Sequence, residues 1–139
     1  MSMVKVMKID EWLEKKSIEK DAIIFKDQNW TFSHLKKLIT KTSLFLQNEC
    51  QLKVGDRLCY YGTNNPEQIV LLFAASKIGA IMFPINWRLA NPEIEYLIKH
   101  SNPNVIFFDT KFEEKISQIH IPRSIKTITV GNSEIYKKS

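Results

Sequence analysis

Glycine is scarce in this chain of 139 residues, which contains four: Gly55, Gly62, Gly79 and Gly131. A nucleotide site built on backbone N–H groups needs closely spaced glycines, because a side chain would keep the phosphate away from the backbone. Neither G-x-G-x-x-G nor G-x-x-x-x-G-K-[ST] occurs, and a G-x-S-x-G nucleophile elbow is missing too. These 139 residues therefore exclude phosphate binding by a glycine-rich loop.

Cysteine and histidine are also few. Cys50 and Cys59 form no C-x-x-C pair, and Cys59 sits in an apolar run, so we expect buried free thiols. The histidines, His34, His100 and His120, are scattered, and none lies near a cysteine at zinc-ligand spacing. The sequence predicts neither a disulfide nor a metal site.

Long hydrophobic runs are absent as well. The longest uncharged apolar stretch, "IVLLFAAS", is far too short to span a bilayer, and the beginning "MSMVKVMKIDEW" lacks the apolar core of a signal peptide. Hydrophobic residues make up 44% of the chain and charged residues 25%, which is typical of a folded globular domain. We expect a cytoplasmic protein without a transmembrane segment.

Charge is not concentrated anywhere. The formal charge is +5, from 20 basic and 15 acidic residues, and both halves of the chain carry a small positive excess. Nucleic-acid binders usually gather basic residues on one face, so the sequence argues against that class of partner. A mildly basic surface would also suit an anionic small molecule, and this alternative stays open.

The first third of the chain predicts two helices separated by a hairpin. Residues 9–16 favour a short helix with Trp12 and Leu13 packed inward. Residues 22–32 favour a β-hairpin, because two short β-prone runs flank the four polar residues 26–29. A longer helix follows, with Thr31 or Ser33 as a possible N-cap. Its apolar face is formed by Leu35, Leu38, Ile39, Thr42, Phe45 and Leu46.

The rest of the chain alternates strands and helices, which predicts an α/β fold with a mainly parallel sheet and right-handed crossovers. Expected strands are 54–62, 80–83, 104–109 and 125–130, and expected helices lie between them. The run "AIMF" does not alternate, which favours a strand buried on both faces. All residues from 69 to 75 are apolar, so we expect the helix that contains them to be buried nearly all round.

The tripeptide "NPE" occurs twice, each time at the start of an expected helix. Asn65 and Asn91 are natural N-caps, and the prolines that follow them suit the first helical position. Gly79 is placed to end the first of these helices in a left-handed conformation. The repeat indicates two consecutive strand–helix units.

Polar connectors follow three of the expected parallel strands: residues 63–65, 86–88 and 109–111. Ligands of open parallel sheets bind beyond the carboxyl ends of the strands, so these connectors are candidate site segments. Arg88 has two interpretations: a surface residue packed on Trp87, or a phosphate clamp with fixed paired donors. Asp109 either caps the next helix or orients a substrate.

Three segments resemble the N-terminal region of the adenylate-forming enzymes, and in particular the acyl-CoA synthetases, or AMP-binding acid–CoA ligases. They are "WTFSHL", "LKVGDRLCYYGTNNPE" and "AASKIGAIMFPINWRLANPEIEYLIKHS". The resemblance covers about residues 22–110, and Lys77 to Leu89 is its most specific part.

The resemblance implies a fold and a reaction. The family joins a carboxylic acid to CoA, using ATP and magnesium to make an acyl-adenylate first. A ligase of fatty acid metabolism would fit this pattern. The chain resembles the start of the large domain, a β-hairpin plus consecutive βα units. We therefore expect one partial domain (1–139), divided into an N-terminal helix region (1–21), a hairpin (22–32), an α/β core (33–131) and a tail (132–139).

The resemblance also limits what the residues can do. The family's phosphate loop, adenine-site motif, ribose-binding Asp and catalytic lysine have no counterpart here, so we assign no catalytic residue, no metal ligand and no cofactor to this chain alone. Arg88 matches the arginine of the family's N-x-R-L segment, which implies a contact with a CoA phosphate. Lys111 is a weaker candidate for the same role.

Two readings of the whole chain remain. It is either the N-terminal segment of a truncated acid–CoA ligase or a free-standing binding or interaction module derived from one. A segment cut from a larger domain would expose apolar surface and tend to self-associate.

Overall fold

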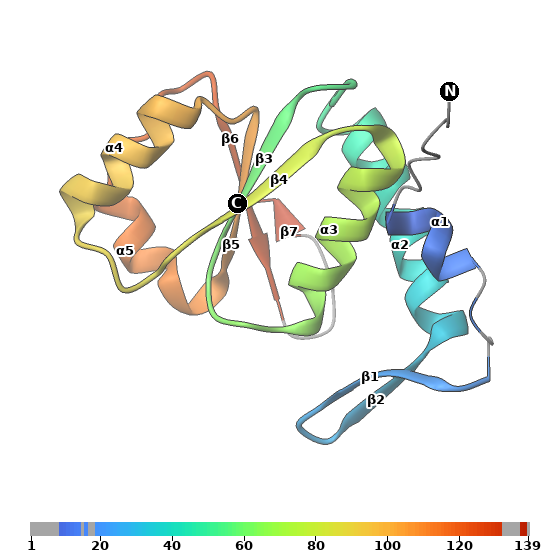
Figure 1. Cartoon of the computed structure of the whole chain (residues 1–139). Coiled ribbons are helices and arrows are strands. Elements are labelled where there is room, and N and C mark those ends of the chain that lie inside the picture. The colour runs from blue at the N-terminus through green and yellow to red at the C-terminus, as the bar shows by residue number, and fades with distance from the viewer. Residues whose placement is uncertain (1–8, 15, 17–18, 132–136, 139) are drawn as a thin grey trace, which may run out of the picture.

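The computed structural model describes residues 9–14, 16, 19–131 and 137–138, and Figure 1 shows a sheet with helices on both faces and a projecting hairpin. The hairpin consists of β1 (Asp21–Phe25) and β2 (Gln28–Thr31). The remaining elements are α1 (Ile9–Glu14), α2 (Phe32–Asn48), β3 (Arg57–Tyr61), α3 (Pro66–Ile78), β4 (Ile81–Ile85), α4 (Asn91–Ser101), β5 (Val105–Asp109), the 3₁₀ turn η1 (Thr110–Phe112), α5 (Glu113–Ser117), β6 (Lys126–Val130) and β7 (Lys137–Lys138). Most of the expected tail, 132–139, lies outside the described residues.

The main sheet has five strands in the order β4-β3-β5-β6-β7. Its first four strands are parallel, and β7 pairs antiparallel with β6. In the shared register Tyr60 lies between Pro84 of β4 and Phe107 of β5. The predicted α/β class with a mainly parallel sheet is confirmed.

Two hydrophobic clusters cover the two faces of the sheet, because successive side chains of a strand point to opposite sides. Leu58 and Tyr60 of β3 join α1, α2 and α3 in the first cluster. Cys59 and Tyr61 of the same strand join α4 and α5 in the second cluster. Figure 1 shows these two helix groups on opposite sides of the strands. Cys50 and Cys59 are both buried, as expected, and neither is in a disulfide with another described residue.

The helix ends follow the sequence signals in most places. The Thr31 hydroxyl accepts a hydrogen bond from the His34 backbone N–H at 3.1 Å, which caps α2. Asn65 caps α3 in the same way, through the Gln68 N–H at 3.0 Å, and Pro66 opens the helix. Gly79 ends α3 with φ +76°, a conformation that favours glycine.

The second "NPE" does not repeat the first. The N-cap of α4 is Ala90, and Asn91 is already the first helical residue, so the expected Asn91 cap is wrong. The Glu93 carboxylate accepts a hydrogen bond from the Ala90 backbone N–H at 2.9 Å. That bond is one half of a capping box. The helix therefore begins with the Glu93 carboxylate bound to the Ala90 backbone, and not with a cap formed by the Asn91 side chain.

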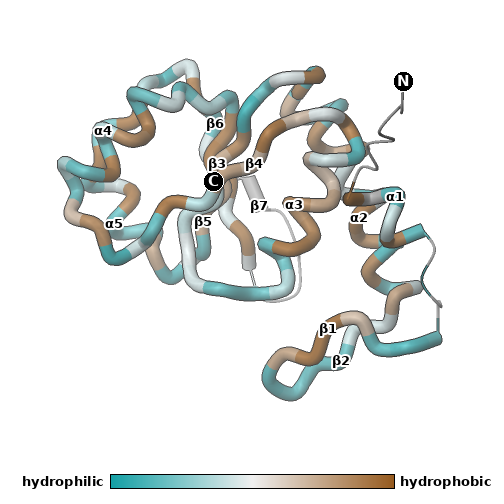
Figure 2. The backbone as a smooth tube through the Cα atoms, viewed as in Figure 1, coloured by the Kyte–Doolittle hydropathy of each residue, from teal (hydrophilic) through white to brown (hydrophobic). Residues whose placement is uncertain are grey.

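The hairpin and the first helix also differ from expectation. The turn of the hairpin contains two residues, Lys26 and Asp27, because Gln28 already pairs with Phe25. Figure 2 shows β1 as the hydrophobic strand of the pair and β2 as the hydrophilic one. In α1, Leu13 is buried but Trp12 is 45% exposed, because neighbouring residues of a helix point in different directions and only Leu13 faces the core. The expected inward packing of Trp12 is therefore wrong. The Lys16 ammonium lies 4.3 Å from the Trp12 ring centroid instead.

Burial around β4 is lower than the apolar runs predict. β4 is an edge strand of the described sheet, so Ile81 is 51% exposed and the predicted burial on both faces is wrong. In α3, Ile69 and Leu72 are exposed, because the helix packs against the sheet and α2 and leaves a third side uncovered. The expectation of burial all round α3 is therefore wrong as well.

Candidate functional site

The three polar connectors lie beyond the carboxyl ends of adjacent strands. Tyr61, the last residue of β3, pairs with Ile85 at the end of β4 and is in register with Phe108 near the end of β5. Residues 63–65 follow the end of β3 after Gly62, residues 86–88 follow β4 directly, and residues 109–111 begin with the last residue of β5. The strand order along the chain therefore predicted that these three connectors share one edge of the sheet.

A crevice opens between β3 and β5 at this edge. From β3 the chain passes through α3 to β4 on one side, then returns through α4 to β5 on the other side of β3. The helices that follow β3 and β5 lie on opposite faces of the sheet. Such a reversal of strand order leaves a gap between the two departing chains, where ligands of open α/β sheets bind.

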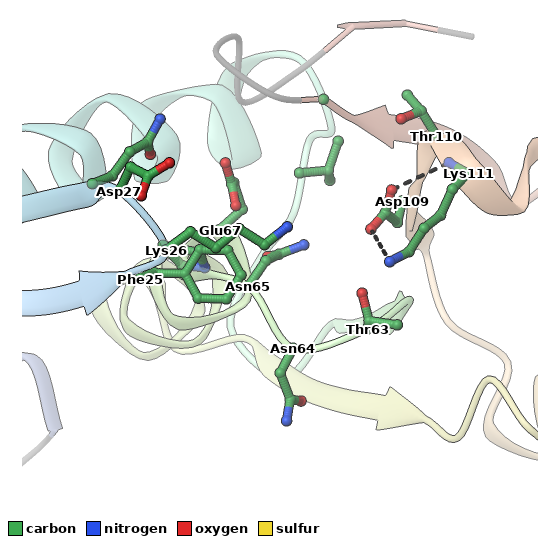
Figure 3. A pocket seen from close by; sticks show the side chains of 14 residues that line it. Phe25, Lys26, Asp27, Thr63, Asn64, Asn65, Glu67, Asp109, Thr110 and Lys111 are labelled. Carbon is green, nitrogen blue, oxygen red and sulfur yellow. Dashed lines mark hydrogen bonds and ion pairs between the residues drawn. The ribbon is translucent and has the colours of Figure 1, made fainter.

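A pocket of about 530 Å³ occupies this position. Figure 3 shows side chains from the hairpin turn, the β3–α3 connector and the β5–η1 connector around it. The lining residues are Phe25, Lys26, Asp27, Gln28, Thr63, Asn64, Asn65, Pro66, Glu67, Asp109, Thr110, Lys111, Val130 and Gly131. The contribution of the hairpin turn was not predicted, because the turn is far away in sequence.

Tyr60 fixes the shape of the β3–α3 connector from inside the sheet. Its hydroxyl donates to the Thr63 carbonyl oxygen at 2.9 Å and accepts from the Asn65 side-chain amide at 2.6 Å. Burial, with a smaller contribution from the charge of Asp109, raises the pKa of Tyr60, so the phenol stays protonated and able to donate. A Cβ at Gly62 would lie 2.7 Å from this hydroxyl, which explains the glycine.

Three carboxylates, of Asp27, Glu67 and Asp109, and two lysines give the pocket a mixed charge. Burial raises the pKa of Glu67, and the charge of Asp109 adds a smaller rise. Asp109 accepts a hydrogen bond from the Lys111 backbone N–H at 3.2 Å and lies 3.8 Å from the Lys111 ammonium. Asp109 thus acts as the N-cap of η1, the structural one of its two predicted roles. Lys26 and Lys111 are both exposed.

The segment Asn86–Arg88 lies beyond β4, and local contacts account for most of it. The Asn86 side-chain oxygen accepts a hydrogen bond from the Arg88 backbone N–H at 3.0 Å, which forms a tight Asx turn. Trp87 is half-buried, with its ring centroid 5.6 Å from that of Phe112. The Arg88 guanidinium lies 5.0 Å from the Trp87 ring centroid and is exposed.

The structure does not bring the two candidate cations to one pocket. Lys111 lines the crevice between β3 and β5, whereas Arg88 is not among the residues around it. Trp87, next to Arg88, packs in the cluster with α4 and α5. Among the described residues no ion pair of Arg88 occurs, while Lys111 pairs with Asp109.

The side chains at this edge offer donors and acceptors to anions and polar ligands. In the described part of the chain, no three His, Cys, Asp or Glu side chains come together to hold a metal ion, so these residues by themselves do not fit Mg²⁺. None of the described helices has the length and apolar character needed to cross a membrane. The exposed guanidinium and lysines can bind anions, and the amides and hydroxyls of the pocket can hydrogen-bond a polar ligand.

Comparison with known proteins gives a consistent result. The family model described as "AMP-binding enzyme" matches residues 9–138. The indoleacetate–CoA ligase of Aromatoleum aromaticum is 33% identical over 79% of this chain and 22% of its own length. The fatty acid–[acyl-carrier-protein] ligase ScoC of Streptomyces coeruleorubidus is 27% identical over 59% of this chain and 16% of its own length.

A solved structure agrees on the fold. The benzoate CoA ligase of Burkholderia xenovorans LB400 superposes with a TM-score of 0.82 over 91% of this chain and 26% of its own length, at 14% identity. The chain spans about a fifth of the length of the two curated relatives, 22% and 16%. The similarity lies in their N-terminal part.

The raised pKa of Glu67 leads to a prediction about stability. A carboxyl that holds its proton more tightly in the folded state loses stability as pH rises through the interval between its unfolded and folded pKa values. We expect Glu67→Gln to raise the melting temperature at about pH 7 and to have a smaller effect at about pH 3, where Glu67 is mostly protonated in both states.

The measurement is a thermal melt of both proteins across that pH range. Glu19→Gln, at an exposed position outside the helices and strands, is the matched control and should change the melting temperature at pH 7 far less than Glu67→Gln. A difference between wild type and Glu67→Gln that is constant with pH would contradict the assignment.

Proposed function

The chain belongs to the AMP-binding enzyme family, and from that membership we propose that it forms the N-terminal part of an ATP-dependent carboxylic acid–CoA ligase. Such a ligase joins the acid to AMP with release of pyrophosphate, then transfers the acyl group to the thiol of CoA with release of AMP. The match of the family model to residues 9–138 carries this proposal. ATP, Mg²⁺, CoA and the acid are reactants of the whole ligase and not of this chain alone.

The names of the two curated relatives indicate the chemical class of the acid. The two curated relatives are named for indoleacetate and for a fatty acid, both of which are carboxylic acids with an apolar body. We place the substrate in that class, fatty acids included. The buried reduced thiols of Cys50 and Cys59 fit a cytoplasmic site of action.

Within this reaction we assign Arg88 to a phosphate of CoA. Its guanidinium is exposed, has no ion pair among the described residues and lies against the Trp87 ring, so it presents its donors to the solvent side. A guanidinium stays charged at every physiological pH and binds phosphate through paired donors. Lys111 is the second candidate, and its ion pair with Asp109 weakens the case for it.

The assignment of Arg88 can be tested by binding. We expect Arg88→Ala to lower the affinity of the chain for CoA by about tenfold, the equivalent of one charge-assisted contact of about 1.4 kcal/mol. The same substitution should not change the affinity for dephospho-CoA, which lacks the ribose phosphate. Isothermal titration calorimetry of both ligands at fixed ionic strength measures the difference.

Two matched variants sharpen that experiment. Arg88→Lys should retain part of the preference for CoA, because the charge stays but the paired donors are lost. Lys111→Ala should have a smaller effect than Arg88→Ala. An equal loss for CoA and dephospho-CoA in Arg88→Ala would show that the residue does not contact that phosphate.

We assign the adenylation chemistry to parts of the ligase other than the described residues of this chain. Charge on the α-phosphate must be stabilised during adenylation, and the described residues offer neither a phosphate loop nor a metal-holding cluster. We expect the purified chain, given ATP, Mg²⁺ and a panel of carboxylic acids, to release no pyrophosphate above the protein-free blank. A complete ligase of the family serves as positive control, and a burst from this chain would contradict the expectation.

The alternative is a free-standing binding or interaction module. The two hypotheses differ in whether the chain is expected to self-associate through exposed apolar side chains. Ile69, Leu72 and Ile81 are exposed on α3 and the edge strand β4, which is unusual for a surface that always faces water. We expect the chain to self-associate through this surface, so that light scattering shows a mass that rises with concentration.

A double substitution, Ile69→Ser with Leu72→Ser, should reduce this association. Leu44→Ser, at an exposed position on α2, is the control and should not. A monodisperse wild-type monomer with one cooperative melting transition would favour the free-standing module.

A further inference from the structure

We propose that Lys115 is a positioning residue that holds the backbone on both sides of Arg88 and thereby aims its guanidinium outward as an anion-binding group. This inference deepens the proposed function, because it concerns the same CoA contact. Lys115 lies in α5, 27 residues beyond Arg88, between the expected strands 104–109 and 125–130.

The contacts of Lys115 are with the connector after β4. Its ammonium donates to the carbonyl oxygens of Trp87 and Leu89, each at 3.0 Å. These carbonyls belong to the residues immediately before and after Arg88. A single charged group therefore binds both flanks of the residue that the proposed function assigns to CoA.

A buried tyrosine reinforces one of the two bonds. The hydroxyl of Tyr61, at the end of β3, donates to the Trp87 carbonyl oxygen at 3.1 Å. The Lys115 ammonium lies 5.9 Å from the centroid of the same Tyr61 ring, which favours its charge. Tyr61 is almost fully buried and packs edge-on against Phe112, so it is a fixed support.

These bonds determine where the Arg88 side chain can go. With both flanking carbonyls turned toward Lys115 and the Arg88 N–H bonded to Asn86, the backbone of Arg88 has little freedom. The side chain then leaves the turn on the exposed side, against the Trp87 ring. An arginine that is already oriented loses less conformational entropy when it binds a phosphate.

The chemistry requires a cation with several donors at position 115. An ammonium carries three N–H groups, enough to donate to both carbonyls at once, and its charge strengthens each bond. A methionine of similar length would fill the same space without donating. Lys115→Met therefore separates the hydrogen bonds from the packing.

The first test does not depend on CoA. Hydrogen exchange, followed residue by residue by NMR, reports the protection of the Arg88 and Leu89 amides, which donate to the Asn86 side chain and backbone. We expect Lys115→Met to lower their protection by about tenfold. Lys115→Arg should preserve most of it, and Lys99→Met, at an exposed lysine of α4, should change nothing.

Two outcomes of this test would overturn the proposal. Unchanged protection at Arg88 and Leu89 in Lys115→Met would mean that the two bonds do not hold the turn. A comparable loss of protection throughout β3 and β5 would mean that Lys115 has a general structural role instead.

The second test links position 115 to the ligand by a double-mutant cycle. We expect Lys115→Met to weaken CoA binding by about fivefold in the wild-type background and to have no further effect in Arg88→Ala. An equal loss in both backgrounds would show that Lys115 acts on CoA independently of Arg88, and would overturn the proposal.

The two tests also distinguish a failure of the proposed CoA contact of Arg88 from a failure of the positioning role of Lys115. If Arg88→Ala leaves CoA binding unchanged, the proposed role of Arg88 fails. The amide protection then still decides whether Lys115 positions the turn.

Discussion

The pairing of β3 with both β4 and β5 is the constraint on which the rest of the structure depends. It places β3 inside the sheet, so its side chains must be buried on both faces, and it brings the ends of three strands to one edge. Alternate residues then fill two separate cores, one against α1, α2 and α3 and the other against α4 and α5. A one-residue shift of β3 would exchange the two sets of side chains and disrupt both cores.

Two adjacent tyrosines convert this arrangement into a site. Tyr60 and Tyr61 point to opposite faces, and the hydroxyl of each donates a hydrogen bond to the backbone of a connector beyond the strand ends. Tyr60 donates to the Thr63 carbonyl after its own strand, whereas Tyr61 donates to the Trp87 carbonyl after the neighbouring strand. The pocket at the strand reversal and the turn that carries Arg88 are therefore both fixed by the last residues of one buried strand.

The pocket beyond β3 and β5 and the turn beyond β4 differ in the charges that they present. The pocket between β3 and β5 contains carboxylates as well as lysines, and burial keeps the pKa of Glu67 raised. The turn beyond β4 presents one exposed guanidinium supported by a half-buried ammonium at Lys115. Among the described residues no carboxylate pairs with Arg88, whereas Lys111 at the pocket pairs with Asp109.

The sequence by itself determined the features that depend on a few neighbouring residues. The hydrophobic period predicted α2, Asn65 and Gly79 predicted both ends of α3, and the alternation of short apolar runs with helices predicted a parallel sheet. Tertiary structure alone decided that β4 is an edge strand, that Ala90 rather than Asn91 caps α4, that the hairpin turn borders the pocket and that Lys115 holds the turn around Arg88. The physical reason is range: caps and periodicity act within about four residues, whereas strand order and the contacts of Lys115 join residues tens of positions apart.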